Sequence, residues 1–157
     1  MRRVSSSTPK DGPLTAHVGF WLRFVSNHVS GAFRQKLSRK EVSVAEWALM
    51  RELFEHGGVA PSQLAARLGM TRGGVTKIAD KLVARAFVTR TADPIDHRAH
   101  TLGLTAAGRR LVPVLVKIAD RNDAEFFGHL PVKTKQTLTT ILRDLAKHHH
   151  LGSVPVD

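Results

Sequence analysis

The chain of 157 residues contains no cysteine. Disulfides, thiolate metal sites and cysteine-based oxidant sensing all require that side chain, so the sequence excludes each of them. Any regulatory signal must therefore reach this protein through another chemistry.

Long apolar segments are also lacking. No apolar run approaches the roughly 18 residues of a membrane span, and residues 1–13 have no apolar core of the kind found in secretory signals. We therefore expect a cytoplasmic protein without a membrane partner. Residues 1–13 are rich in Ser, Pro and Gly and carry three basic side chains, which predicts a disordered basic arm.

Catalytic motifs are missing as well. The sequence has no Gly-rich phosphate loop, no Gly-x-Ser-x-Gly elbow and no His-Glu-x-x-His helix. The carboxylates of Glu46, Glu52 and Glu55 are spaced as the charged outer face of one helix rather than as a facing pair. We expect neither an enzyme nor a cofactor.

Acidic residues are scarce relative to basic ones. There are 13 Asp plus Glu against 24 Lys plus Arg, which gives a formal net charge of +11. Residues 1–40 hold eight basic and one acidic side chain, residues 60–110 hold nine and three, and residues 111–157 hold six and five. This distribution indicates a polyanionic partner whose binding depends on phosphate neutralisation.

Residues 61–84 contain two helical patterns separated by a glycine. The first begins with Pro61, a favourable residue in a first helical turn, and places Leu64 and Leu68 on one side before Gly69 ends it. Two short helices joined by such a turn are typical of a helix-turn-helix.

The second pattern starts at Thr71, whose hydroxyl can accept a hydrogen bond from a backbone N–H of the first turn. Its apolar positions predict a buried stripe of Val75, Ile78, Ala79 and Leu82. The other face is polar, as in a recognition helix that reads the major groove. The predicted DNA-binding residues on it are Thr71, Arg72, Gly73, Gly74, Thr76 and Lys77, with Asp80 at the edge.

Among these residues, Arg72 and Lys77 can pair with guanine acceptors, and Thr76 can meet a thymine methyl. Gly73 and Gly74 have two interpretations. Lacking side chains, they let backbone N–H groups approach a phosphate at the helix N-terminus. Helix propensity alone equally allows a frayed first turn.

A basic hairpin follows. Residues 87–91 and 101–105 alternate as antiparallel strands, and the segment between them contains Pro94 and two aspartates, which favour a turn. Arg98 lies near the tip, where an exposed guanidinium suits the negative potential of a narrow minor groove. The predicted wing contacts are Arg90, His97 and Arg98.

Helical periodicity runs through both ends of the chain. Apolar residues recur at three- and four-residue steps from Leu14 to Leu37, and further helices are expected near Thr105 and from Pro131. A helix over about 44–56 should turn an apolar side inward, formed by Trp47, Met50, Leu53 and Phe54.

These patterns predict a mainly α-helical protein with a small β-hairpin wing. Residues 41–104 would form a winged helix-turn-helix DNA-binding region, residues 14–40 and 105–150 a helical dimerisation region, and residues 151–157 a tail. Long helices at both ends, with the DNA-binding region between them, favour a homodimer. The two recognition helices would then lie about one DNA turn apart, which suits a palindromic site.

The sequence resembles the MarR family of bacterial transcriptional regulators over most of the chain. The resemblance runs through residues 63–71, 75–77, 81–82, 93–98 and 104–108. Its most specific part is Asp-x-Arg at 96–98 followed by Leu-Thr-x-x-Gly at 104–108. Two departures are Gly73 with Gly74, where the family usually has helix-favouring or hydroxyl residues, and Ala86, which replaces a common Gly.

The resemblance implies an obligate dimer on a palindromic operator, favours repression, and implies a crevice for a small aromatic or phenolic ligand. The candidate pocket residues are His17, Trp21, His28, Trp47 and Arg51. Helical spacing also places both tryptophans in a core or interface, and Arg51 on a solvated helix face.

Nine histidines raise the question of a metal site. Consecutive residues such as 148–150 point in different directions on a helix, so they form no preorganised site, and cationic histidine also suits a helix C-terminus. We therefore expect no bound metal. The leading hypothesis is a ligand-released repressor that binds double-stranded DNA. The alternatives are an architectural DNA-binding protein with little sequence specificity and a zinc-responsive regulator.

Overall fold

The computed structural model describes residues 12–152. Its elements in chain order are η1 (Leu14–Ala16), α1 (Val18–Ser38), α2 (Val44–His56), α3 (Pro61–Leu68), α4 (Arg72–Ala84), β1 (Val88–Ala92), β2 (His100–Leu104), α5 (Ala106–Phe127) and α6 (Val132–His148). The predicted fold, mainly helical with a two-stranded antiparallel hairpin, is confirmed. Among these residues no helix has the length and hydropathy that crossing a bilayer requires.

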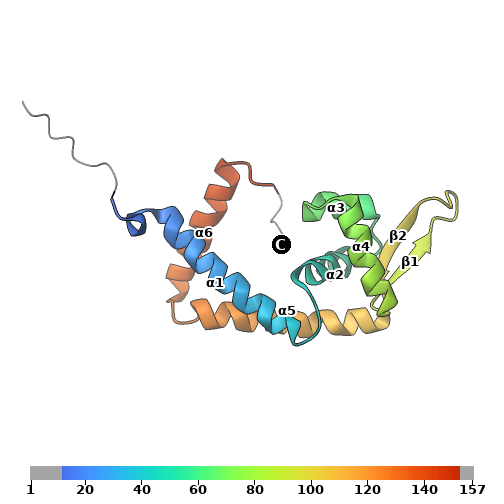
Figure 1. Ribbon diagram of the computed structural model, residues 1–157, viewed down its shortest axis with the longest axis horizontal. Helices are drawn as coiled ribbons and strands as arrows, with labels where there is room; N and C mark the ends of the chain where they lie inside the picture. The colour runs from blue at the N-terminus through green and yellow to red at the C-terminus, as the bar shows by residue number, and fades with distance from the viewer. Residues whose placement is uncertain (1–11, 153–157) are drawn as a thin grey trace, which may run out of the picture.

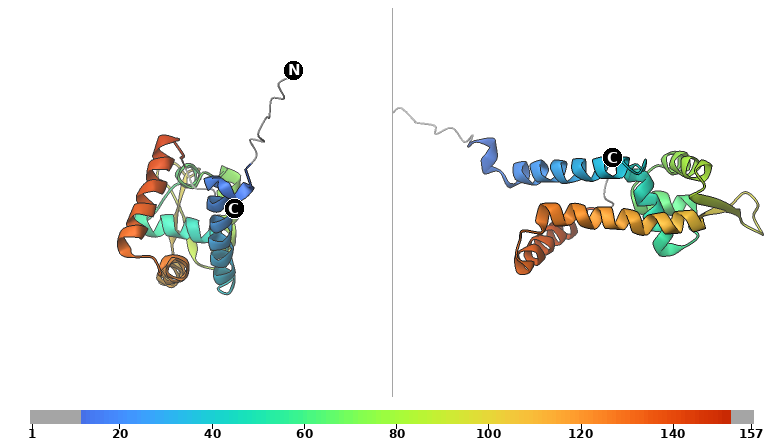
Figure 2. Two further views of the ribbon diagram at one scale, coloured as in Figure 1. Left: turned by 90° about the vertical axis from the view of Figure 1, so that its left-hand side faces the viewer. Right: turned by 90° about the horizontal axis from the view of Figure 1, so that it is seen from below.

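The elements form two parts of an elongated molecule (Figure 1). We call α2, α3, α4, β1 and β2 the reading head, and α1, α5 and α6 the platform. Figure 2 shows α1 and α5 running side by side, with the reading head at one end and α6 turning away at the other. The long helix α5 therefore belongs to both parts: its N-terminal half adjoins the hairpin and its C-terminal half leads into α6.

Local signals end α2, and start and end α3, where the sequence predicts. Pro61 occupies the first turn of α3, and Gly69 ends that helix in the left-handed conformation with φ 62°. Gly57, with φ 74°, ends α2. Each glycine adopts a backbone conformation that an L side chain would disfavour.

One apolar core holds the reading head together. The predicted stripe of α4 is buried at Val75, Ala79 and Leu82, with Ile78 packed against it. The remaining members come from α2, α3, the hairpin, the segment before α3 and the start of α5: Leu49, Met50, Leu53, Val59, Leu64, Ala65, Leu68, Val88, Leu102, Leu104 and Val112. Because α4 buries one face here, its opposite face is left to solvent.

A smaller core joins the platform helices. Leu37 and Val42 pack with Leu115 of α5. Beside them the buried side chain of Asn122 donates to Val29 O at 3.2 Å and accepts from Lys36 Nζ at 2.8 Å. These contacts attach α1 to the middle of α5.

Some boundaries differ from the prediction. The helix expected from Leu14 begins at Val18, because His17 is extended with φ −90° and ψ 129° and separates it from a short 3-10 turn. Both strands are displaced by one residue toward the wing tip, as β1 starts at Val88 and β2 at His100. Phe54, predicted to face inward, is exposed.

Two predicted segments lie largely outside the described residues. Of the expected basic arm at 1–13, residues 1–11 are not described, and of the expected tail at 151–157, residues 153–157 are not described.

Candidate nucleic-acid interface

The predicted recognition helix α4 begins with a hydrogen-bonded cap. Thr71 Oγ1 accepts from the Gly74 N–H at 3.0 Å, as its position before the helix predicts. A Cβ on Gly74 would lie 3.1 Å from that same oxygen, whereas a Cβ on Gly73 would meet nothing within 4 Å. The first turn is therefore helical and capped by Thr71, and Gly73 leaves open space on its surface.

The polar face of α4 is free to meet a ligand. Arg72, Thr76 and Lys77 are all exposed. Thr76 Oγ1 donates to Arg72 O at 3.0 Å within the helix, which leaves its methyl and its lone pairs for an outside partner. Within residues 12–152, neither Arg72 nor Lys77 takes part in an ion pair.

The wing is a short hairpin whose strands pair in register from Val88 with Leu104 to Ala92 with His100. Its turn is built by carboxylates. Asp93 Oδ1 accepts from the backbone N–H groups of Ile95 and Asp96 at 2.8 and 2.9 Å. These bonds, the one from Asp96 first, hold the pKa of the Asp93 carboxyl below its ordinary value, because they stabilise the charged form.

The second carboxylate of the turn positions the predicted minor-groove contact. Asp96 Oδ1 accepts from the Arg98 backbone N–H at 3.1 Å, and Ala99 N–H donates to Asp96 O at 2.9 Å. The Arg98 and His97 side chains stay exposed at the tip. The Asp-x-Arg motif thus has a structural reason, since the Asp holds the backbone that presents the Arg.

Arg90 has a different environment from Arg98. Its guanidinium forms an ion pair with Asp80 Oδ1 on α4. The structure therefore brings this strand residue onto the edge of the polar face of α4, where it links the wing to the recognition helix. Sequence spacing did not indicate this pair.

The Leu-Thr-x-x-Gly motif joins the wing to α5. Thr105 Oγ1 donates to Ala86 O at 2.7 Å and accepts from the Gly108 N–H at 3.0 Å. A Cβ on Gly108 would lie 2.2 Å from Phe87 O, a distance that no side chain tolerates. Glycine is required at this position because α5 crosses the start of the hairpin so closely.

The prediction that Glu46 lies on an exposed face of α2 is wrong. Glu46 was placed on a charged outer face of α2, but it is buried, because its carboxylate accepts from the Ser43 N–H at 2.8 Å and lies 3.7 Å from Arg85 Nη1 at the end of α4. The Ser-x-x-Glu spacing at 43–46 is a capping-box signal that could have indicated the first contact. The contact with Arg85 depends on the tertiary fold.

A cavity of about 460 Å³ lies where α1, α2 and α5 meet, between the platform and the reading head. We call it the waist pocket. Its lining residues are Val29, Ser30, Phe33, Trp47, Ala119, Asp120, Asn122 and Asp123. The rings of Phe33 and Trp47 meet edge to face, with centroids 6.3 Å apart.

The five predicted ligand-pocket residues do not share one cavity. Trp47 alone lines the waist pocket. Trp21 lines a separate groove, and its indole N–H donates to Thr15 O at 2.8 Å. His28 Nδ1 lies 2.7 Å from Phe24 O, Arg51 pairs with Glu55 at 2.6 Å, and His17 precedes the first turn of α1.

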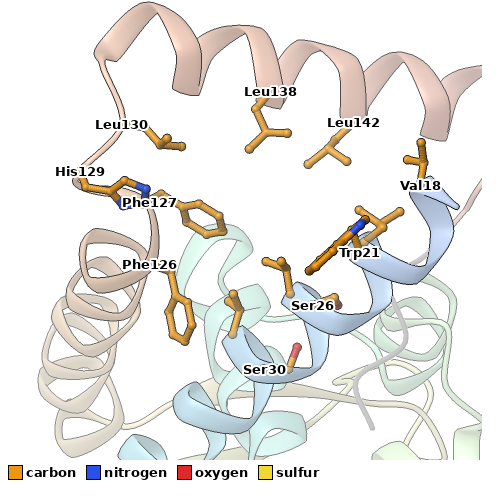
Figure 3. A pocket seen from close by; sticks show the side chains of 13 residues that line it. Val18, Trp21, Ser26, Ser30, Phe126, Phe127, His129, Leu130, Leu138 and Leu142 are labelled. Atoms are coloured by element: carbon orange, nitrogen blue, oxygen red, sulfur yellow. The ribbon is translucent and has the colours of Figure 1, made fainter. Parts of the chain in front are cut away.

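The platform carries an apolar groove of about 640 Å³, which we call the platform groove (Figure 3). It is lined by side chains of α1, the end of α5 and α6, including Val18, Trp21, Phe126, Phe127, Leu138 and Leu142. In Figure 3, Trp21 from α1 and Leu142 from α6 approach the groove from opposite sides. Many of these side chains remain exposed, and α6 has no buried residue.

The three histidines at 148–150 lie at the end of α6 and in the turn that follows it. His148 is the last residue of α6, and His150 has φ 51°. In residues 12–152, the group with three metal-ligating side chains close together is Glu52, Glu55 and His56 on α2, and its carboxylates already pair with Arg67 and Arg51.

Comparisons with known proteins agree with this geometry. The family model described as the MarR family matches residues 42–100. The transcriptional regulator HosA of Escherichia coli O111:H- is 24% identical over 105 residues, which cover 67% of this chain and 78% of HosA. The HTH-type transcriptional repressor NicR of Pseudomonas putida is 23% identical over 146 residues, covering 88% and 92%.

Among solved structures, CouR from Rhodococcus jostii RHA1 bound to p-coumaroyl-CoA is similar with a TM-score of 0.74 and 26% identity, covering 87% of this chain and 96% of that one. The resemblance drawn from the sequence is thereby confirmed, and with it the winged helix architecture.

Proposed function

We propose that this chain, whose residues 42–100 match the MarR family model, is a winged helix-turn-helix transcriptional regulator of that family and represses transcription by binding a palindromic operator as a homodimer. The observation that carries the proposal is the exposed polar face of α4, next to a wing whose turn is shaped to present Arg98. A helix with unpaired cations at its capped N-terminal end suits the major groove.

The contact assignment follows from exposure and pairing. Arg72, Thr76 and Lys77 would read base edges, and Thr71, Gly73 and Gly74 would bring backbone N–H groups to a phosphate. Arg98, with His97 beside it, would enter the minor groove. We assign two effects to the ion pair between Arg90 and Asp80. It orients the wing relative to α4, and it leaves less of the positive charge of Arg90 available to a DNA phosphate.

The homodimer is supported by apolar surface on the platform. Side chains along α1 and α6 that have helical spacing remain exposed: Val18, Leu22, Val25, Leu138, Ile141, Leu142 and Leu145. Exposed apolar patches of this kind mark protein–protein interfaces. A second copy of the chain, packed through residues 14–40 and 105–150, would cover them and leave residues 41–104 to meet DNA.

Repression rather than activation is supported by the relative NicR, which is a transcriptional repressor. Release by a small ligand is supported by the similar structure of CouR, which holds p-coumaroyl-CoA.

Within this chain, Trp47 of the waist pocket is the neighbour in sequence of Glu46, whose carboxylate contacts Arg85 at the end of α4. A ligand that displaces the first turn of α2 would therefore move the recognition helix.

Selection from a random DNA pool at physiological salt, followed by sequencing of the bound fraction, tests the proposal. We expect a palindromic motif with half-sites about one helical turn apart. Bound DNA without a motif, or with only an A·T bias, would instead support an architectural protein that depends on phosphate contacts and groove shape.

A further inference from the structure

The charges around the waist pocket select among ligand classes. Of its lining residues in the described part of the chain, Asp120 and Asp123 are carboxylates and none is Lys, Arg or His. An aromatic wall and carboxylates are the combination that binds aromatic or hydrophobic cations, because a cation is attracted both to a ring face and to a negative charge. We propose that the waist pocket binds a small aromatic amine rather than an aromatic acid.

The polar side chains of the pocket differ in whether they already form hydrogen bonds or ion pairs within the protein. The Asn122 side chain is occupied, since its amide donates to Val29 O and its oxygen accepts from Lys36 Nζ. Asp123 Oδ2 pairs with Lys135 Nζ of α6 at 2.9 Å. Asp120 has no ion-pair partner among residues 12–152, so it is the carboxylate that an ammonium group can meet.

The aromatic side chains of the pocket offer a packing surface for the ring of such a ligand. Phe33 comes from α1 and Trp47 from α2, with their planes 75° apart. A third ring can therefore pack against one of them while the edge of the pocket at Asp120 takes the amine. The cavity volume of about 460 Å³ lies within the range of small-molecule sites.

The overall charge of +11 does not reverse this preference. Charges separated by more than about 8 Å are screened at physiological salt, so the nearest groups decide. Lys36 and Lys135 both contact lining residues, since Lys36 Nζ lies 2.8 Å from Asn122 Oδ1 and Lys135 Nζ lies 2.9 Å from Asp123 Oδ2. Each is already countered by a carboxylate, Lys36 by Glu125 and Lys135 by Asp123. An aromatic acid would therefore meet uncompensated Asp120.

Isothermal titration with a matched pair of probes tests the inference. Tyramine and 3-(4-hydroxyphenyl)propionate share a phenol ring and a two-carbon chain, and they carry opposite charges. We expect tyramine to bind about tenfold more tightly than the acid, as the combined effect of one exposed ion pair and one cation–π contact. Equal or tighter binding of the acid would overturn the inference, and so would no heat from tyramine at millimolar concentration.

Single substitutions test whether tyramine binds in the waist pocket. Asp120→Asn should weaken tyramine binding about three- to fivefold, whereas Asp144→Asn, an equal charge change on α6 outside the pocket lining, should leave it unchanged. Trp47→Leu should also weaken it, with Trp47→Phe restoring part of the affinity. Equal effects of Asp120→Asn and Asp144→Asn would show that only the net charge matters and would overturn the site.

The role of this amine as an effector rests on the proposed function, but its binding does not. We therefore measure operator affinity with and without tyramine as a separate experiment. If no operator is selected while tyramine binds through Asp120, the proposed function fails and the site remains. If an operator is selected and tyramine does not bind, the site fails and the DNA-binding function remains.

Discussion

Replacing Ala86 by glycine should stabilise the protein. Ala86 has φ 58°, a left-handed conformation, and directly follows the C-cap residue of α4. Its N–H donates to Val83 O at 2.9 Å, and Phe87 N–H donates to Leu82 O at 2.9 Å, which together form a helix C-terminal motif that usually contains glycine.

The magnitude follows from two opposing effects. An L side chain in the left-handed region costs about 1–2 kcal/mol, while glycine at the same place loses about 0.4–1 kcal/mol through the greater freedom of the unfolded chain. The difference between the midpoints of these ranges predicts that Ala86→Gly raises the free energy of unfolding by about 0.8 kcal/mol.

Urea denaturation at one fixed protein concentration measures this change, since the stability of the proposed homodimer would depend on concentration. The control is Ala66→Gly, an exposed position inside α3, which should instead lower the free energy of unfolding by about 1 kcal/mol. Glu41, with φ 55°, offers a second test, as Glu41→Gly should also stabilise. If Ala86→Gly destabilises the protein as Ala66→Gly does, the reasoning from backbone strain is refuted.

Four further results are expected. Gly108→Ala should lower the free energy of unfolding by about 2 kcal/mol or more, because its Cβ would meet Phe87 O at 2.2 Å; an unchanged urea midpoint would contradict this close approach. Arg72→Ala should relax base preference at one operator position and cost about 1–3 kcal/mol there, whereas Arg98→Ala should weaken binding to all sequences and lower the salt slope; equal losses from both on every sequence would contradict the assignment. Lowering the pH should leave the two backbone hydrogen bonds to Asp93 intact until the pH falls below the ordinary range of an Asp carboxyl, because its pKa is lowered in the folded state; amide chemical shifts that titrate at the ordinary pKa would argue against those bonds. Leu142→Asp should shift the protein toward a monomer in analytical ultracentrifugation, since a charge would enter the platform groove; an undisturbed dimer would place the interface elsewhere.

Interactions between residues close in sequence were predictable. The cap of Thr71 on Gly74, the end of α3 at Gly69 and the buried stripe of α4 each depend on residues within a few positions of one another. The exposed polar face of α4 follows from that stripe, because a helix that buries one side presents the other. The fold class and the exposed polar face of α4 were therefore predictable from the sequence.

Boundaries were less predictable where a local signal was weak. Helical periodicity continued through His17, although its extended backbone separates η1 from α1. Glu46 matched the spacing of an outer face, yet its contact with Arg85, 39 positions further along the chain, places it inside. Amphipathic spacing indicates which side chains share a helix face, but it does not indicate which other element packs against that face.

The sequence by itself determined the helices, the hairpin, the excess of positive charge and the exposed cations of α4, because capping, periodicity and charge act over short stretches of chain. Only the tertiary structure decided that Arg90 meets Asp80, that Gly108 must lie against Phe87 O, and that Trp47 shares a pocket with Phe33 and Asp120 while Trp21 does not. Such contacts join residues on different elements, and their partners are set by how whole helices pack to bury apolar surface, which no local pattern encodes.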